Sequence, residues 1–174
     1  MSEITFIMGV SGCGKSTVAA ALARASGAQF LEGDDFHPPQ NVAAMAAGQP
    51  LDDAMRAPWL RALGTAAREA ATRGDVVISC SGLKRAYRDL LRDSAGPCMI
   101  LMLHGNPALI RARITARRGH YMPPELLDSQ LATLELPTPQ EQGCALVDIA
   151  GEAEDVISAA ADAQEGLRSG RICG

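Results

Sequence analysis

Short apolar runs alternate along the chain with longer segments in which apolar and polar positions follow helical spacing. The runs predict five strands, at residues 4–8, 29–31, 76–80, 98–103 and 145–149. The run at 98–103 is continuously apolar, which is typical of a strand buried on both faces. Helical segments separate the strands, so we expect βαβ crossovers and a parallel sheet that helices cover on both faces.

The stretches between the strands predict helices at 15–25, 38–48, 54–73, 84–92, 107–117, 125–135 and 153–165. Gly27 and Gly74 follow two of them and are suited to end a helix. Pro58 lies near the start of its helix, where proline is tolerated. No repeat or low-complexity linker divides the chain, so residues 1–174 are expected to form a single domain with a frayed tail from residue 168.

Composition narrows the class of protein. The chain is 47% hydrophobic and 21% charged, as globular domains are, and its 3% of aromatic residues argues against an aromatic-rich β-sandwich. The net charge of −4 provides no basic field for nucleic acid, so no nucleic-acid partner is expected. An anionic ligand must therefore be held by local positive charge.

Cysteine usage and the N-terminal segment bear on the compartment. Five cysteines without a C-x-x-C pair are interpreted as free thiols in a reducing environment. The N-terminal segment has no basic region before its short apolar run, and no stretch approaches 18 apolar residues. We expect a cytoplasmic protein that does not bind membranes. No histidine and cysteine spacing indicates a zinc site.

The segment GVSGCGKS at residues 9–16 fits the phosphate-binding pattern G-x-x-x-x-G-K-[ST], between a predicted strand and a predicted helix. Glycines let the backbone turn its N–H groups toward phosphate oxygens, and a helix N-terminus adds positive partial charge. Lys15 would reach the β- and γ-phosphates of ATP, and the Ser16 hydroxyl would ligate Mg²⁺. The predicted nucleotide-binding residues of this loop are Gly9, Ser11, Gly12, Cys13, Gly14, Lys15, Ser16 and Thr17.

A phosphate loop by itself does not distinguish kinases from GTPases. The guanine-reading N-K-x-D is absent, and the D-x-x-G at 148–151 follows the last strand, too late in the chain, so we interpret it as a chance match. Glu32 and Asp34 follow the second strand two residues apart and would point the same way. One is suited to hold a Mg²⁺-bound water and the other to accept a proton from a hydroxyl; the alternative is a solvated acidic loop.

Several motifs resemble those of the gluconokinase family over about residues 4–150. They are GDDFHP at 33–38, Asn41, Met45, Gly48, PL at 50–51, Asp53, Arg56, PWL at 58–60, CSGLK at 80–84, Tyr87, Arg88, GH at 119–120 and SQ at 129–130. The resemblance implies a P-loop kinase fold with a mobile lid at about 117–124 and substrate-side helices at about 38–73. It also implies ATP-dependent, Mg²⁺-assisted phosphorylation of D-gluconate to 6-phospho-D-gluconate, and a homodimer.

The resemblance also suggests roles for single residues. Asp34 is assigned as the general base and Glu32 as the outer Mg²⁺ ligand. By position, Arg56, Lys84 and Arg88 are expected to gather at the substrate mouth and hold the carboxylate. The alternatives are a surface ion pair of Arg56 with Asp52 or Asp53, and an exposed lysine at a helix start for Lys84. The other expected substrate-binding residues are His37, Gly82 and Gln130. His37 has two further interpretations, as a helix cap or a structural histidine, and Trp59 is expected to anchor the helices.

Arginines before the glycine–proline stretch at 119–124 are expected to act on ATP. Arg117 is the first choice, and Arg118 the second, for the cation that neutralises the transferring phosphoryl group. Arg113 resembles the position that packs on adenine. The alternative is a solvated helix face.

Two other functions compete with gluconate phosphorylation. A kinase for another small acid, such as shikimate, would usually carry a run of glycines after the third strand, where this chain has SGLK at 81–84. A non-catalytic nucleotide-binding module would have no use for Asp34 and the lid arginines together.

Overall fold

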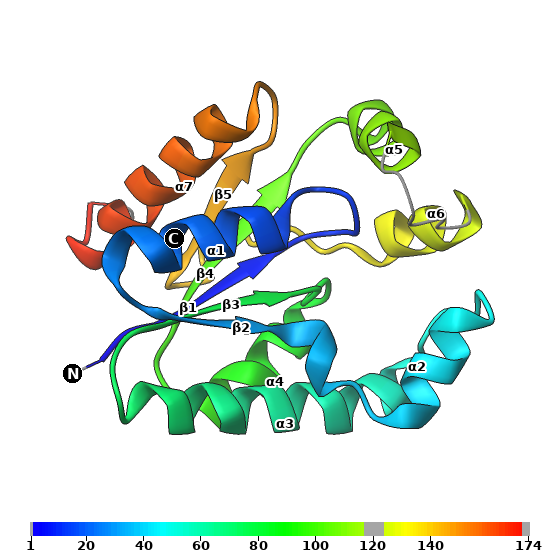
Figure 1. Cartoon of the computed structure of the whole chain (residues 1–174), viewed down its shortest axis with the longest axis horizontal. Helices are drawn as coiled ribbons and strands as arrows, with labels where there is room; N and C mark the ends of the chain where they lie inside the picture. The colour runs from blue at the N-terminus through cyan, green and yellow to red at the C-terminus, as the bar shows by residue number, and fades with distance from the viewer. Residues whose placement is uncertain (1, 117–123, 172–174) are drawn as a thin grey trace.

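A five-stranded parallel sheet organises the computed structural model, which describes residues 2–116 and 124–171 (Figure 1). The strand order is β2-β3-β1-β4-β5, with each neighbouring pair parallel. The strands are β1 (Ile4–Met8), β2 (Gln29–Glu32), β3 (Val76–Cys80), β4 (Met99–His104) and β5 (Cys144–Asp148). The five predicted strands are confirmed, each within one residue at either end.

Helices connect the strands as predicted, and one short helix was not expected. The helices are α1 (Lys15–Ser26), α2 (Pro39–Ala46), α3 (Asp53–Ala71), α4 (Arg85–Ala95), α5 (Pro107–Ala116), α6 (Pro124–Thr133) and α7 (Ala153–Arg168). The unexpected element is the 3-10 helix η1 (Gly33–Phe36), directly after β2. Helix α7 runs three residues past its predicted end, and Arg168 in its last turn pairs with Glu3 and Glu165.

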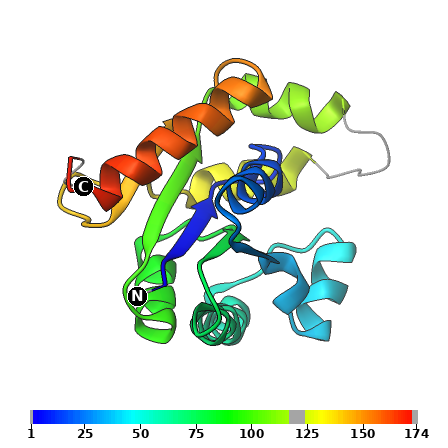
Figure 2. The same ribbon diagram turned by 60° about the vertical axis from the view of Figure 1, so that its left-hand side comes forward.

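Alternate strand residues face two separate hydrophobic cores. Ile7, Val77 and Leu101 pack with α1 and α7 on one face of the sheet. Phe6, Ile78 and Ile100 pack with α3 and α4 on the other. Because successive side chains of a strand point to opposite faces, each buried strand contributes to both cores. The two helical layers on either side of the sheet are visible in Figure 2.

The carboxyl ends of the strands meet the phosphate loop, η1 and the shorter helices. Helices α2, α5 and α6 extend beyond this edge of the sheet rather than covering a face (Figure 1). In a parallel α/β sheet ligands bind at this edge, where the strand order reverses. Here that point lies between β1 and its neighbours β3 and β4. Within the described ranges, no helix is both long enough and apolar enough to span a membrane.

Candidate active site

The phosphate loop connects β1 to α1 in a conformation that requires glycine. Gly12 has a φ of +82°, and a Cβ there would come within 2.4 Å of the Ile114 side chain on α5. Gly14 precedes α1 with a φ of +95° and supplies no side chain to cap the helix. The first N–H groups of α1 therefore remain available to an anion. Lys15 folds back, with Nζ 3.1 Å from the carbonyl oxygen of Val10.

A cavity of about 370 Å³, the larger cavity, lies on one side of this loop. Arg113 of α5 forms part of its wall and donates to the carbonyl oxygens of Ile149 and Gly151, at 2.9 and 2.8 Å. These bonds hold the loop between β5 and α7 against α5. The lining residues are Gly12, Cys13, Gly14, Thr17, Val18, Arg113, Ala116, Gly151, Glu152, Ala153 and Val156.

A second cavity of about 80 Å³, the smaller cavity, lies on the other side of the loop. It brings together six predicted residues: Ser11, Lys15, Asp34, His37, Arg56 and Gln130. The other lining residues are Met45, Gln49, Pro50, Leu51, Ser81, Leu126 and Ser129. A carboxylate, two cations and several hydrogen-bonding groups thus converge on a space next to the phosphate loop.

Asp34 lies on η1, whose first residue, Gly33, makes hydrogen bonds to two buried side chains. The indole N–H of Trp59 donates to the carbonyl oxygen of Gly33 at 2.8 Å, and the Gly33 N–H donates to the Ser79 hydroxyl at 3.3 Å. A Cβ at Gly33 would lie 2.1 Å from the Ser79 carbonyl oxygen, so only glycine fits. The Asp34 side chain itself is 73% exposed and free to meet a ligand.

Glu32 lies one residue before η1, at the register position opposite Ser79, and accepts a hydrogen bond from the Ser79 hydroxyl. Its carboxylate is therefore held at the carboxyl end of β2. Among the residues that the structure describes, no group of three or more His, Cys, Asp or Glu side chains is arranged to hold a metal. A phosphate-bound Mg²⁺ needs only one or two protein ligands. The Ser16 hydroxyl at the start of α1 and the Glu32 carboxylate after β2 are oxygen groups of the kind that such an ion takes.

His37 and Arg56 form the wall of the smaller cavity beside Asp34. The His37 side chain is only 3% exposed, and burial lowers the pKa of its imidazole; Asp34 opposes this shift and Arg56 adds to it. His37 is therefore neutral at physiological pH. Arg56 donates from Nε to the Leu51 carbonyl oxygen at 3.1 Å and lies over the Tyr87 ring, 5.5 Å from its centre.

Lys84 does not line the smaller cavity. Its Nζ lies 2.9 Å from the nearer carboxylate oxygen of Asp53, which also accepts a hydrogen bond from the Tyr87 hydroxyl. The Lys84 hydrogen bond is the main reason why the pKa of Asp53 is lowered, and the same bond raises the pKa of Lys84. Asp53, one of the alternative partners expected for Arg56, is thus paired with Lys84.

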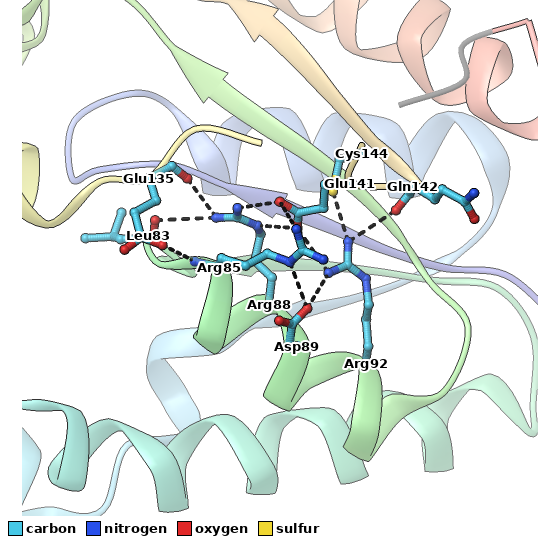
Figure 3. Close-up of polar contacts among 9 residues, drawn as sticks. All are labelled: Leu83, Arg85, Arg88, Asp89, Arg92, Glu135, Glu141, Gln142 and Cys144. Atoms are coloured by element: carbon cyan, nitrogen blue, oxygen red, sulfur yellow. Dashed lines mark hydrogen bonds and ion pairs between the residues drawn. The ribbon is translucent and has the colours of Figure 1, made fainter. Parts of the chain in front are cut away.

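Arg88 is also away from the smaller cavity, in a buried ion pair. Its side chain is 1% exposed and donates from Nε and Nη2 to Glu141, at 2.7 and 2.6 Å. Figure 3 shows Arg85 and Arg92 approaching the same carboxylate, with Asp89 between them. Because its guanidinium is already occupied, Arg88 connects α4 to the segment before β5 instead of facing a ligand.

The remaining predicted substrate residues differ in position. Gly82 is buried against the Met8 side chain, which a Cβ would approach to 2.5 Å, while the neighbouring Ser81 lines the smaller cavity. Gln130 of α6 accepts from the Ser11 N–H at 2.7 Å and donates to the Ser11 hydroxyl at 3.1 Å. Gln130 therefore contacts the phosphate loop directly.

Some lining residues were missed by the sequence analysis. Gly151, Glu152 and Ala153 follow the last strand, and their position at its carboxyl end was a usable indication of a ligand site. Gln49 and Leu126 of the smaller cavity carry no recognisable spacing. The predicted lid residues Arg117 and Arg118 lie outside the described residues.

Known protein families and relatives match this chain in sequence. The family model described as an AAA domain matches residues 4–137. A gluconokinase from Gluconobacter oxydans is 46% identical over 147 residues, which cover 84% of this chain and 81% of the relative. The chain belongs to the gluconokinase family. Its resemblance to that family, inferred from the motifs, is confirmed.

Solved structures agree in fold. The crystal structure of a gluconokinase from Sinorhizobium meliloti has a TM-score of 0.81 at 44% identity, covering 96% of this chain and 95% of that one. That of an unliganded sugar kinase from Janibacter sp. has a TM-score of 0.87 at 41% identity, covering 93% and 94%. The predicted P-loop kinase fold, with a five-stranded parallel sheet between helices, is therefore confirmed.

Proposed function

We propose that this protein transfers the γ-phosphoryl group of ATP to the 6-hydroxyl of D-gluconate and yields 6-phospho-D-gluconate. The observation that carries the proposal is the pair of cavities on either side of one phosphate loop. The larger is walled by the loop and Arg113, and the smaller holds Asp34, Lys15 and Arg56 together. The proposal is supported by a relative that is named gluconokinase and is 46% identical.

Asp34 is the proposed general base. It is the exposed carboxylate of the smaller cavity, fixed at its backbone through Gly33 and placed beside the space that Lys15 also lines. Its carboxylate orients the attacking hydroxyl and takes the proton as the oxygen attacks phosphorus. Phosphoryl transfer asks mostly for positioning and charge, so a single carboxylate is sufficient for the proton transfer.

Arg56 is the proposed partner of the gluconate carboxylate. Lys15 is committed to the phosphates, and burial keeps His37 neutral, so Arg56 is the remaining fixed cation among the described residues of the smaller cavity. Its planar guanidinium matches a carboxylate with two parallel hydrogen bonds. Ser81 and Gln49 offer hydrogen bonds to the polyol hydroxyls.

Ser16 and Glu32 are the proposed residues for Mg²⁺, Ser16 directly and Glu32 through water. A bound Mg²⁺ would neutralise phosphate charge during transfer. Lys15 moves from the Val10 carbonyl to the β- and γ-phosphates, and Arg113 packs against adenine in the larger cavity. Arg117, with Arg118 as the second choice, is proposed to supply the further cation. A single domain, a homodimer and a cytoplasmic location complete the proposal.

A coupled ADP-release assay tests the function. With Mg-ATP, we expect turnover with D-gluconate and none with shikimate, D-glucose, a nucleoside monophosphate or no acceptor. Asp34→Asn should lower kcat by roughly 10²–10⁴-fold, because general-base catalysis is worth about that much, while ATP binding is kept. Asp35→Asn is the matched control, with the same chemical change one residue along η1 and no place in the smaller cavity.

Two results would contradict the proposal. Turnover with shikimate instead of gluconate would assign the smaller cavity to another acid. ATP binding without turnover on any acceptor, unchanged by Asp34→Asn, would favour the non-catalytic nucleotide-binding module.

A further inference from the structure

The His37 imidazole is held on both its face and its edge. The ring stacks on Trp59, with 4.0 Å between ring centres and 17° between planes. The same indole donates a hydrogen bond to the carbonyl oxygen of Gly33, the residue immediately before Asp34. One buried side chain thus sets the plane of His37 and the position of the backbone before Asp34, so His37 has little freedom to turn.

Asn41 of α2 determines which ring nitrogen of His37 carries the proton. Asn41 is fully buried, and its Nδ2 donates to the Met55 carbonyl oxygen at 2.9 Å. A carbonyl oxygen only accepts, so the amide cannot be reversed without placing two oxygens against each other. Nδ2 also lies 3.3 Å from Nδ1 of His37, which its second hydrogen can reach. Nδ1 must therefore accept, and the proton of the neutral ring resides on Nε2.

The Oδ1 atom of Asn41 shows that this orientation is maintained at a cost. Within the described part of the chain, Oδ1 is the buried side-chain polar atom that has no hydrogen-bond partner. An unsatisfied buried acceptor destabilises a fold. In this arrangement both Nδ2 hydrogens have acceptors, one the Met55 carbonyl oxygen of α3 and the other Nδ1 of His37.

Nε2 of His37 faces the proposed base. It lies 3.8 Å from Oδ1 of Asp34, longer than a hydrogen bond and within the reach of a small movement of the exposed carboxylate. Catalytic hydrogen bonds are often long without substrate and shorten in the complex. The charged groups that act on the ring are Asp34 and Arg56, and Asn41 is the group bonded to Nδ1.

We propose that Asn41 and Trp59 hold His37 as the neutral Nε2–H tautomer, which makes His37 a positioning residue for the Asp34 carboxylate. The Nε2–H group donates to one carboxylate oxygen and turns the other toward the acceptor hydroxyl. No proton is transferred by His37. The effect on turnover rests on the proposed function, whereas the tautomer itself does not.

The tautomer is measured directly by ¹⁵N NMR of the full-length protein labelled at histidine, with His37→Gln used to assign the ring signals. In the unmodified protein we expect the Nδ1 of His37 to show the shift of an unprotonated ring nitrogen and Nε2 that of a protonated one. The reverse pattern, or an even mixture of tautomers, would overturn the proposal, and this measurement requires neither turnover nor a variant at Asn41.

Asn41→Asp replaces the donor with an acceptor, so the His37 proton should move to Nδ1 or the ring should become doubly protonated. We expect kcat for gluconate to fall roughly tenfold or more, because a small misplacement of a reacting group can cost about 10²-fold, with KM for ATP unchanged. Gln40→Asp adds the same charge one residue away, on an exposed position of α2, and should change neither the spectrum nor kcat.

His37 variants separate positioning from packing. The amide introduced by His37→Gln still offers an N–H group, so this variant should retain more kcat than His37→Leu. Equal losses in both would contradict a positioning role. If the spectrum shows the Nε2–H tautomer but gluconate is not phosphorylated, the proposed function fails and the tautomer assignment stands.

Discussion

The three cations expected to hold the substrate carboxylate differ in whether their charged groups already have partners within the protein. The guanidinium of Arg88 is surrounded by Glu141 and the carbonyl oxygens of Leu83 and Glu135. Lys84 is held by Asp53. Arg56, in contrast, uses only Nε in a hydrogen bond within the described residues. An occupied cation binds a new anion poorly, because its present partner must first be displaced.

We therefore expect Arg56→Gln to raise KM for gluconate about tenfold or more, since a hydrogen bond to a charged group contributes about 1.5–3 kcal/mol. Arg56→Lys should recover part of the loss, because it keeps the charge without the planar fork. Lys84→Met is the control and should raise KM far less. Steady-state kinetics at saturating ATP measure all three, and a larger effect at Lys84 would assign the carboxylate to that residue instead.

At the scale of elements, the segments beyond the carboxyl ends of the strands are joined by side chains rather than by sheet hydrogen bonds. Trp59 of α3 holds η1, and Gln130 of α6 holds the phosphate loop at Ser11. Because Ser11 lines the smaller cavity, α6 is connected to the loop at the point where the two substrates would meet.

A double-mutant cycle tests the connection between α6 and the loop. Gln130→Met removes both hydrogen bonds, and Ser11→Ala removes the one that involves the hydroxyl. The loss in kcat/KM caused by Ser11→Ala should shrink in the Gln130→Met background, with a coupling of about 0.5–1.5 kcal/mol. Gln49→Met, the same change at another glutamine of the cavity, should be additive with Ser11→Ala. Additivity at both glutamines would show that the hydrogen bond between Gln130 and the Ser11 hydroxyl does not contribute in solution.

At the scale of the whole molecule, Glu141 and the α4 arginines Arg85, Arg88 and Arg92 form a cluster of charged side chains. This Glu141 cluster connects α4, which covers one face of the sheet, to the segment before β5, the strand at the edge of the sheet. Glu141 is 2% exposed, and three arginines of α4 surround it (Figure 3). Burial alone would raise the pKa of this carboxyl, but the hydrogen bonds from Arg88 and Arg92 outweigh burial and lower it to about 2.

This depressed pKa predicts how stability depends on pH. The ion pair contributes fully above the ordinary pKa of 4.5, and its contribution is lost as the pH falls from there toward about 2. At neutral pH, Glu141→Gln should lower stability by about 3 kcal/mol, or Tm by roughly 6–12 °C, because Arg88 is left buried without its partner. Thermal unfolding should show the Tm gap to the unmodified protein narrowing in acid.

Glu69→Gln, at an exposed position of α3, is the control for a lost surface charge and should shift Tm very little at either pH. A Tm gap for Glu141→Gln that stays constant down to acid pH would contradict the assigned pKa.

The sequence by itself determined the strands, the long helices, the phosphate loop and the family. These depend on local periodicity and on contiguous motifs, which fix backbone conformation over a few residues. It also predicted that Asp34, His37, Arg56, Lys15 and Gln130 share a site, because the phosphate loop and the family motifs mark each of them.

Only the tertiary structure decided which partner each side chain has. Arg88 and Glu141 are 53 positions apart, Lys84 and Asp53 are 31 apart, and Gln130 and Ser11 are 119 apart. A motif shows that a cation is present but not which carboxylate folding brings beside it. Whether that charge is neutralised in the core or left open to a ligand depends on packing between elements. The spacing of residues along the sequence does not determine that packing.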